Sequence, residues 1–587
     1  MGAFYWAAMF NKKTASERHQ LPETLDASRP KCGLERRFDA RSEFRLTGSR
    51  VAQAEAPSSS APLPRWLAAR RRKQLLAVLA IFLVSLAFRL PFLARPLQGE
   101  HDWLTIHSLL TISIWQQVGL SHAHYSLIMN YPNEADKYIS YVEKGTVMDQ
   151  RGNTYFVAFP PFAFLLGFAV IHLLHLPADP IWLRFINLAL LLPASLCFFL
   201  LLERMLQNLG SAVASRFAML GLALFLFDRA VLLSLGLYFP VILVVPLWIM
   251  AVYFFFAARD GWLSRGPALT VFFSLTFLAA YCDWLGVVAA GVFFLWSLVG
   301  GKRNRILALL SGTAGSLAVL LTILQYASIS GIGSYLQALL FRFQDRSGLS
   351  AQSQYGLTIF TLNTYHEIWN RYIEQHHFLL LCILCLVFTH IVTARRFDFL
   401  KGNSVARGLL FLFGLPVLID HLLLMNHTAI HDYAALKAAP VLALLAISLL
   451  VNIYTARPMS AESSSAGISP IFMRYAGVVA VVCLLSAKDY LIQRNVLYPN
   501  EARLGSEIRN RSDAGQVIFL KQDARSDVTP NLIYFAGRNI KLVHGTDDAE
   551  AFLRDYHKSR GILFDAGADG ALVSQPQPVN LSPDAGP

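Results

Sequence analysis

The sequence predicts an α-helical protein that crosses a membrane many times and carries a small α/β domain at its C-terminal end. Of its 587 residues, 55% are hydrophobic and only 15% are charged, whereas soluble domains have a charged share of about a quarter. Apolar runs long enough to span a bilayer, which takes about 20 residues each, recur from residue 74 to residue 488. Beyond them the pattern changes to short apolar stretches between polar turns, which is typical of an α/β domain.

The first 65 residues are polar and rich in arginine, and they contain the segment APSSSAPLP. They lack the apolar core of a secretory signal, so we expect the first spanning helix to act as an uncleaved anchor. We predict that residues 1–65 form a disordered cytoplasmic segment.

Eleven apolar runs within residues 66–488, the predicted transmembrane domain, have the composition and length of spanning helices. In chain order they are 74–93, 184–203, 212–228, 238–257, 267–284, 285–300, 306–326, 377–394, 407–425, 433–454 and 472–488.

A twelfth apolar run, PPFAFLLGFAVIHLLHL at 160–176, begins with two prolines and carries two histidines near its far end. If this run does not cross, the later basic loops fall on the same side as the RRRK of residues 70–73, as the positive-inside bias requires. If it did cross, every later basic loop would fall on the opposite side. We therefore predict a helix that lies at, or dips into, the outer surface.

The net charge of +13 would suggest a nucleic-acid partner in a soluble protein, but here the basic residues gather in short loops between apolar runs. We interpret them as topology signals and expect no nucleic-acid partner. The basic loops are 70–73, 203–216, 259–265, 301–305, 394–407 and 455–458.

The six cysteines form no disulfide framework and no metal motif. Cys382 and Cys385 make a CxxC, but it lies in the middle of LLLCILCLVF, where two small apolar side chains are expected. The sequence therefore requires no cofactor.

The titratable residues that do not set the topology gather in the loops on the outer side. The hexapeptide QGEHDW (98–103) opens the first of these loops, which runs to about residue 183. We therefore predict a multi-pass protein, of the bacterial inner membrane, whose active site faces the periplasm or exterior.

Glu100, His101 and Asp102 stand together in this hexapeptide. Ionisable side chains next to membrane helices are functional candidates, because they cost energy unless they meet water, a partner or substrate. Glu100 and Asp102 are two residues apart, so on a helix they point about 200° away from each other. Only one of them is expected to act chemically, and a helix cap in water is the alternative for both.

Two segments after QGEHDW are rich in aromatic residues. WLTIHSLLTISIWQQVGL (103–120) has the pattern of a helix that lies in the membrane interface, and RGNTYFVAFPPF brings Tyr155 to the start of run 160–176. Surface helices that frame an acidic residue would form a shelf between lipid and water. Such a shelf suits a substrate with a hydrocarbon tail and a polar head.

Five basic side chains on the outer side could hold a lipid phosphate. Arg342 and Arg346 are four residues apart and share a face if helical, and His427, His431 and Lys437 follow in NHTAIHDYAALKAAP. Arginine pairs with phosphate through two hydrogen bonds, and lysine acts as a point charge.

Three acidic residues leave other roles open for these groups. Asp345 and Asp432 could hold the basic side chains as ordinary ion pairs. Asp283, in YCDWLG at the outer end of a helix, could line the cavity or cap a helix hairpin.

The tail alternates apolar stretches with polar turns. We predict strands at 516–520, 531–537, 540–545 and 561–565 and a helix at 550–560. Residues 489–575 would thus form a small α/β domain, and the Pro-rich residues 576–587 a disordered end.

In this order, the features resemble the GT-C superfamily of membrane glycosyltransferases, which includes protein O-mannosyltransferases and lipid A aminoarabinose transferases. QGEHDW lies where that superfamily keeps an acidic residue, in a first outer loop of surface helices. YFVAFPPFAFLLGF looks like its aromatic-Pro-Pro segment, and NHTAIHDYAALKAAP like its late outer loop. The likeness covers about residues 74–455.

The resemblance implies transfer of a sugar from a polyprenyl-phosphate donor to a glycan, lipid or protein acceptor on the outer side, with inversion. It makes Asp102 the first choice for the general base and Glu100 the second, while Arg342, Arg346 and Lys437 would offset the charge of the leaving phosphate. His101, Tyr155, His431 and Asp283 would complete the substrate site. A divalent cation that bridges carboxylates and phosphate stays open.

Three other functions remain as alternatives. A polysaccharide polymerase or ligase would also act on lipid-linked glycans, and the outer loop 327–376 fits one. A transporter or flippase of lipid-linked sugars would place polar residues in the middle of the membrane and show internal repeats, and we find neither in the sequence. A structural membrane subunit would tolerate the loss of Asp102.

Overall fold

A computed structural model describes residues 65–99, 101–139, 145–234, 236–301, 304–349, 357–393, 403–456, 470–521, 528–567 and 569–581. The chain divides into two compact units, Met1–Leu63 and Pro64–Pro587, and every described residue belongs to the second. The predicted disordered segment 1–65 lies almost wholly outside the described residues, as does Glu100.

Eight stretches of the described chain are long and apolar enough to cross a membrane. They are Arg71–Leu93 of α2 (Arg65–Leu93), α5 (Pro180–Met205), α8 (Pro240–Asp260), α11 (Arg305–Ser330), α13 (Leu362–Thr393), α14 (Ser404–Leu423), α17 (Pro470–Arg494) and Asp432–Thr455, which joins the 3-10 helix η3 (Asp432–Ala438) to α16 (Ala439–Thr455). Four shorter apolar helices accompany them: α4 (Phe162–Leu173), α6 (Ser211–Leu226), α9 (Arg265–Ala280) and α10 (Trp284–Val299). The predicted fold class, a polytopic α-helical membrane protein, is confirmed. Eight of the eleven predicted spans fall on the long stretches and three on α6, α9 and α10.

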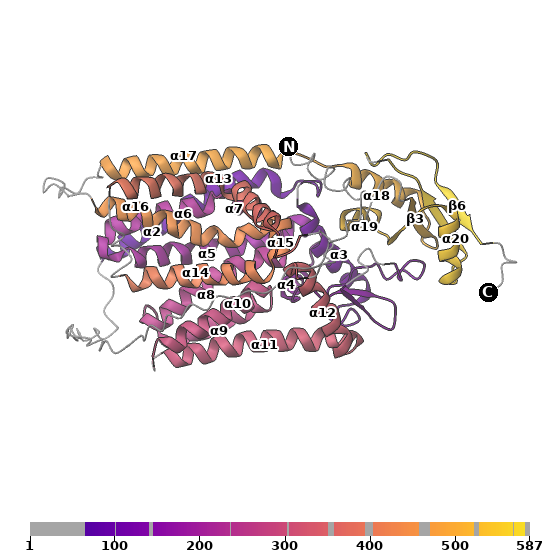
Figure 1. Ribbon diagram of the computed structural model, residues 1–587, viewed down its shortest axis with the longest axis horizontal. Helices are drawn as coiled ribbons and strands as arrows, with labels where there is room; N and C mark the ends of the chain where they lie inside the picture. The colour runs from indigo at the N-terminus through magenta and orange to yellow at the C-terminus, as the bar shows by residue number, and fades with distance from the viewer. Residues whose placement is uncertain are drawn as a thin grey trace, which may run out of the picture. The chain divides into compact units, whose positions relative to one another are not determined.

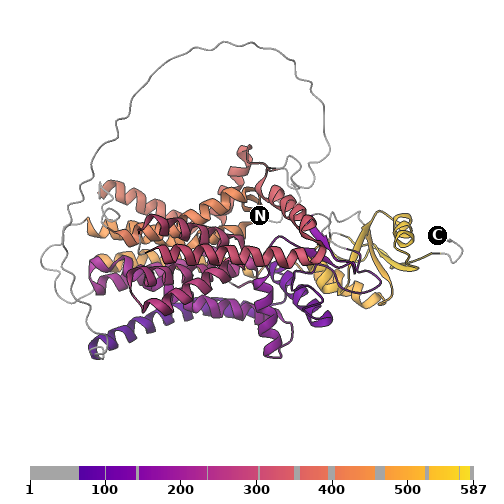
Figure 2. The ribbon, with the colours of Figure 1, turned by 90° about the horizontal axis from the view of Figure 1, so that it is seen from below.

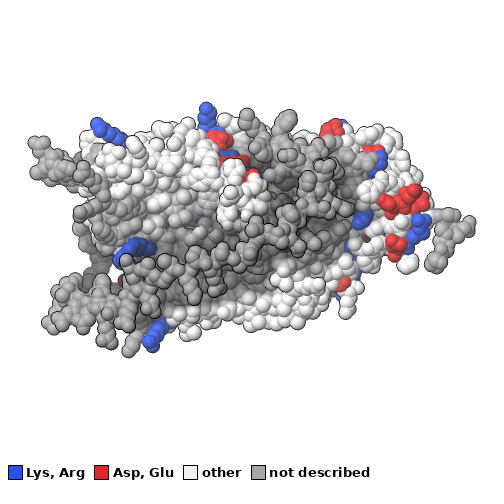
Figure 3. All heavy atoms as spheres, in the orientation of Figure 1, with Lys and Arg blue, Asp and Glu red and all other residues white. Residues whose placement is uncertain are grey.

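The long helices run side by side in a bundle, which both ribbon views show (Figures 1 and 2). On the face seen in Figure 3, the described sides of this bundle carry few charges, and charged side chains gather toward its ends and over the C-terminal domain. This distribution is expected of helices whose sides contact lipid.

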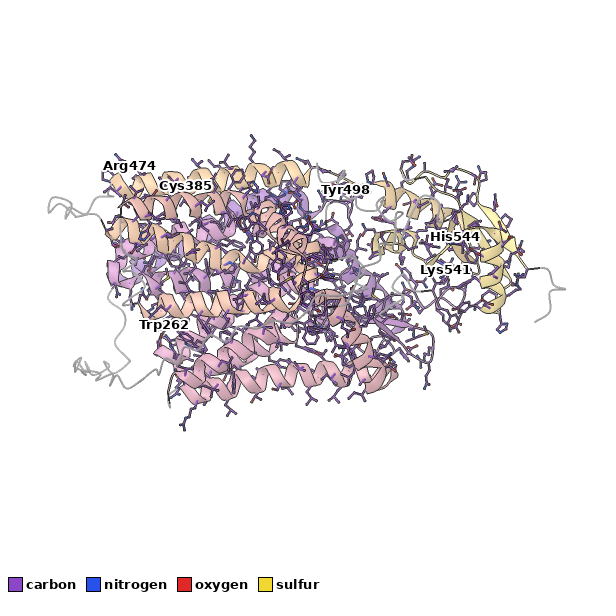
Figure 4. All side chains as sticks on the ribbon, viewed as in Figure 1. Trp262, Cys385, Arg474, Tyr498, Lys541 and His544 are labelled. Carbon is purple, nitrogen blue, oxygen red and sulfur yellow. The ribbon has the colours of Figure 1, made fainter. Side chains whose placement is uncertain are left out.

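The basic loops of the described chain meet at one end of the bundle. Arg71 and Gln74 at the start of α2 contact Glu203, at 3.7 and 2.8 Å, and the guanidinium of Arg204 lies 5.3 Å from the Trp262 ring centroid. Figure 4 shows Trp262 and Arg474 at the end of the bundle away from Tyr498. This shared end is what the positive-inside argument requires of the loops.

Helix α4 begins at the opposite end. The amide of Phe162 donates to the Tyr281 carbonyl at 3.1 Å, and the Trp284 indole donates to the Ala158 carbonyl at 2.8 Å. These contacts anchor α4 where α9 ends and α10 begins. With 12 residues it is about 18 Å long, too short to cross about 30 Å of hydrocarbon, in keeping with the prediction for run 160–176.

Shorter elements cover this second end. They are α3 (Asp102–Val118), β1 (Thr146–Met148), β2 (Thr154–Phe156), α7 (Arg229–Ser234), α12 (Ile332–Ser347) and α15 (Met425–Ile430). β1 and β2 form an antiparallel pair.

The C-terminal domain follows α17. It consists of α18 (Asn500–Arg511), β3 (Val517–Lys521), α19 (Pro530–Ala536), β4 (Ile540–Val543), α20 (Thr546–Asp555), β5 (Arg560–Phe564) and β6 (Gln577–Asn580), with the sheet order β4-β3-β5-β6. β3 is parallel to β4 and β5, and β6 is antiparallel to β5.

Two segments of this domain differ from the sequence prediction. Residues 531–537 form a helix and not a strand, because Thr529 caps it, Pro530 occupies its first turn and Gly537 ends it in the left-handed conformation (φ 65°). Within the tail predicted to be disordered, 577–580 form strand β6, whose Val579 is buried. The Pro-rich composition of the tail led to a prediction of disorder, which is wrong for this edge strand.

Asn539 fastens the C-terminal domain to the segment between α3 and α4. Its side chain accepts from the Tyr131 amide at 2.7 Å and donates to the carbonyls of Tyr131 and Asp136, at 2.8 and 3.0 Å. Arg538 adds an ion pair with Asp136 at 2.8 Å. Buried amides of this kind hold two segments in a fixed relation, because each lost partner would leave a desolvated polar group.

We expect Asn539→Ala to loosen this attachment by about 3 kcal/mol, since it leaves several buried backbone groups unpaired. Hydrogen exchange should then rise at residues 131–139 and in β4. Asn510→Ala, at an exposed position of α18, is the matched control. Unchanged exchange in Asn539→Ala would contradict the assignment.

Candidate active site

Asp102 lies at the start of α3 with its carboxylate completely buried. Arg95 and Arg184 contact its two oxygens at 3.0 and 3.2 Å, and Arg494 lies 3.8 Å away. The Gly99 amide also donates to it, at 2.7 Å. We call these residues the Asp102 cluster.

The Asp102 cluster joins elements that are far apart in the sequence. Arg95 follows α2, Arg184 belongs to α5 and Arg494 ends α17, from which the chain enters the C-terminal domain. Arg95 also donates to the Arg494 carbonyl, and the Tyr498 amide donates to the Gln98 carbonyl at 2.6 Å. Because Arg95, Arg184 and the Gly99 amide all donate to Asp102, the carboxylate acts first as an electrostatic anchor for QGEHDW.

His101 leads from this anchor toward the bundle. It adopts the left-handed conformation (φ 62°), which is uncommon for a residue with a side chain. Its Nε2 lies 3.0 Å from a carboxylate oxygen of Asp432, which also accepts from Gln375 at 2.6 Å. A small cavity of about 10 Å³, lined by His101, Asp432, Tyr433 and Arg494 among others, has room for about one water molecule.

Aromatic rings from two parts of the chain surround this point. The ring centroid of Trp103 lies 5.9 Å from that of Tyr433 and 6.0 Å from that of His431, and His431 and Tyr433 stack at 5.0 Å. His107 joins them 5.7 Å from Trp103. We call these four residues the aromatic cluster. Such rings offer apolar faces against which a sugar or a lipid chain can pack.

Burial favours the neutral form of three histidines in this region, His107, His427 and His431. Burial lowers the pKa of His107 to about 4 and that of His431 to about 3. Burial also holds the pKa of His427, whose ring lies 4.5 Å from His431, well below its usual value. They contribute hydrogen-bonding atoms rather than positive charge.

Helix α12 has an apolar side and a basic side. Ile332, Leu336 and Leu340, each four residues from the next, are exposed large apolar side chains. Arg342 and Arg346 lie on another side, with their guanidinium carbons 4.6 Å from the ring centroids of Phe156 and Phe159 respectively. A helix that exposes leucines and turns arginines inward is expected at a lipid boundary.

Lys437 lies inside the bundle between two buried carboxylates. Its ammonium is 2.7 Å from Asp420 and 3.7 Å from Asp283. Asp283 also caps α10 by accepting from the Leu285 amide at 3.0 Å. Of the two roles that the sequence left open for Asp283, the cap is present. We call Lys437, Asp420 and Asp283 the Lys437 cluster.

Tyr155 lies outside these groups. Its hydroxyl donates to Asp149 at 3.0 Å, and its ring contacts His124 at 5.7 Å. Burial raises the pKa of this phenol, and the nearby carboxylate adds to the effect. The neighbouring Phe156, not Tyr155, reaches Arg342 of α12.

The structure thus brings His101, His431, Lys437, Asp283, Arg342 and Arg346 to the same end of the bundle, with Asp102 beside them. Sequence reasoning assigned no role to Arg95, Arg184, Arg494 or Asp420. Arg184 and Asp420 lie within apolar runs, and a charge in such a run is a signal that could have found both. Among the described residues, no three His, Cys, Asp or Glu are grouped as a metal site.

No family model and no curated protein sequence matches this chain. Solved structures do match its fold. The oligosaccharyltransferase of Archaeoglobus fulgidus, tethered to an acceptor peptide, is 13% identical with a TM-score of 0.53, and the match covers 85% of this chain and 70% of that one. ArnT from Cupriavidus metallidurans, bound to undecaprenyl phosphate, is 10% identical with a TM-score of 0.52, and the match covers 86% and 94% of the two chains.

The archaeal oligosaccharyltransferase AglB in complex with an inhibitory peptide and a dolichol-phosphate gives similar values, 13% identity, a TM-score of 0.52 and coverage of 84% and 70%. At identities this low, the structural matches show a shared fold and nothing more. The fold that the resemblance implies is therefore confirmed.

Proposed function

We propose that this protein is a membrane glycosyltransferase that moves a sugar from a polyprenyl-phosphate donor to an acceptor on the extracytoplasmic side, with inversion. Helix α12 carries the proposal. Its exposed apolar residues suit the hydrocarbon tail of a donor, and Arg342 and Arg346, on another side of the same helix, suit the phosphate. The fold shared with transferases that hold lipid phosphates supports the same function.

In the proposed reaction, an acceptor hydroxyl oxygen attacks the anomeric carbon while the bond from that carbon to the phosphate oxygen breaks. The polyprenyl phosphate leaves with the bonding electrons, and Arg342 and Arg346 offset its charge. The hydroxyl proton passes to a base. The aromatic cluster offers the sugar a packing surface close to these arginines.

The base belongs to QGEHDW. Asp102 already accepts hydrogen bonds from Arg95, Arg184 and the Gly99 amide. Few lone pairs of its carboxylate are therefore left to accept a proton from the acceptor. We propose that Asp102 fixes the segment and that Glu100, the second choice of the sequence analysis, takes the proton. His101, oriented by Asp432, borders the same point.

Lys437 balances the charge of the site in this proposal. Its ammonium faces Asp420 and Asp283, and we assign the phosphate to Arg342 and Arg346. The proposed reaction requires a donor that carries a lipid phosphate. A divalent cation bound at the carboxylates is compatible with this reaction.

Binding of undecaprenyl phosphate tests the donor half of the proposal. We expect the double variant Arg342→Gln/Arg346→Gln, in lipid nanodiscs, to bind this lipid at least about a hundredfold more weakly, since two charged hydrogen bonds of about 1.5–3 kcal/mol each contribute about 3 kcal/mol or more. Native mass spectrometry can measure the change. Arg503→Gln, at an exposed position of α18, is the control, and equal binding by all three proteins would refute the role of α12.

A further inference from the structure

A cleft of about 650 Å³ opens between the first outer loop and the C-terminal domain. Its walls come from α3 (Ser113, Gln117), from the loop at Tyr131 and from α18 and α19 (Arg509, Tyr534). The volume lies within the range of pockets that hold small ligands, about 300–1,000 Å³. Nothing in the proposed reaction uses this cleft.

The walls of the cleft are held in place. Asn539 and Arg538 bond the C-terminal domain to Tyr131 and Asp136, and Tyr131 lines the cleft. Helix α3 is tied to the same loop, because the Trp115 indole donates to the Ser126 carbonyl at 3.1 Å. A cleft whose walls are already fixed loses little conformational entropy when a ligand binds.

The chemistry of the lining suits a carbohydrate. Ser113, Tyr131 and Tyr534 offer hydroxyls, and Gln117 offers an amide with both donors and an acceptor. Burial raises the pKa of Tyr131 and Tyr534, so both phenols keep their protons. The ring of Phe535 adds an apolar face of the kind on which a sugar ring can pack.

The lining disfavours an extended peptide. Peptides that bind in extended form often pair with the free edge of a sheet. The described residues that line the cleft lie on helices α3, α18 and α19 and on two loops, and none of them belongs to a strand. No carboxylate is among them, and Arg509 leaves the cleft able to take a neutral or acidic sugar.

Helix α3 connects the cleft to the active site. Trp103 of the aromatic cluster and Gln117 of the cleft are 14 residues apart on this helix, which corresponds to about 21 Å. His107 and Ser113 are closer, at about 9 Å. A single sugar at the reacting centre cannot reach the cleft, whereas a chain of sugars can.

We propose that the cleft is a binding site for the distal part of an oligosaccharide acceptor. This inference rests on the proposed function and deepens it, because it names the acceptor class as a chain of sugars. The reacting hydroxyl would lie at the aromatic cluster, and sugars further along the chain would lie against Gln117, Tyr534 and Phe535.

An array of oligosaccharides of graded length tests the proposal with the full-length protein in nanodiscs. We expect binding that strengthens with length and falls about fivefold to tenfold in Gln117→Ala and in Tyr534→Ala, as the loss of one or two hydrogen bonds predicts. Gln116→Ala changes the exposed neighbour on α3 and should bind as wild type. Tyr534→Phe keeps the aromatic ring and removes only the hydroxyl, so it separates the loss of a hydrogen bond from misfolding.

Three results would overturn the proposal: no oligosaccharide is bound, binding is equal in wild type, Gln117→Ala and Tyr534→Ala, or peptides on a parallel array are bound instead. Release of sugar from the polyprenyl-phosphate donor into water, measured separately, tests the proposed function without any acceptor. Glycan binding without donor turnover would refute the proposed function but not the assignment of the cleft as a glycan site. Donor turnover without glycan binding would refute only that assignment of the cleft.

Discussion

Replacing Asp102 by asparagine is expected to lower the free energy of unfolding by about 3–5 kcal/mol, the usual cost of removing one partner from a buried ion pair. The substitution keeps the shape of the side chain but removes its charge. Arg95, Arg184 and Arg494 would then face one another without a counter-charge, in a cluster where Asp102 and Arg184 are completely buried. Thermal and denaturant unfolding of the purified protein measures the effect.

Two further variants make this result specific. Asp179→Asn makes the same chemical change at the exposed start of α5, where aspartate caps the helix. It should leave stability nearly unchanged, because asparagine caps as well as aspartate. Adding Arg494→Gln to Asp102→Asn should recover part of the loss, since one guanidinium fewer needs a partner. If Asp102→Asn unfolds like wild type and only stops turnover, Asp102 is the base and not the anchor.

Lys437→Met should have an effect of similar size, about 3–5 kcal/mol. It leaves the buried carboxylates of Asp420 and Asp283 without the ammonium that separates them. The double variant Lys437→Met/Asp420→Asn should be more stable than Lys437→Met, because it removes both members of the closest pair. Unfolding in detergent and the yield of folded protein measure both.

Lys488→Met on α17 serves as the control for this series, since Lys488 is exposed. A surface lysine contributes little to stability, so its loss should change unfolding by about 0.5 kcal/mol or less. A double variant that is less stable than Lys437→Met alone would show that Lys437 and Asp420 do not act as a pair.

The membrane fold follows from the sequence because hydropathy and loop charge act locally. The eleven predicted spans all fall on helices, and run 160–176 is the short helix α4. The spacing of Arg342 and Arg346 also predicted their common face, since a four-residue spacing brings two side chains together on any helix.

The partners of Asp102 could not be predicted in the same way. Arg184 and Arg494 reach Asp102 from helices that are separated from it by 82 and 392 residues, and only the packing of the bundle sets such pairs. Strand β6 was missed because an edge strand with little apolar content looks like a tail. Residues 531–537 were assigned to a strand from their apolar run, although Pro530 and Gly537 mark the ends of a short helix.

Sugar transfer by the purified protein in liposomes tests the central claim most directly. The assay follows a radiolabelled sugar from a polyprenyl-phosphate donor into an oligosaccharide acceptor or into water. The account predicts turnover by wild type and by Arg503→Gln, and a loss of about a hundredfold in kcat/KM in Arg342→Gln/Arg346→Gln. Equal turnover by the double variant would contradict the account, and so would the absence of turnover by the wild-type protein with every polyprenyl-phosphate sugar supplied.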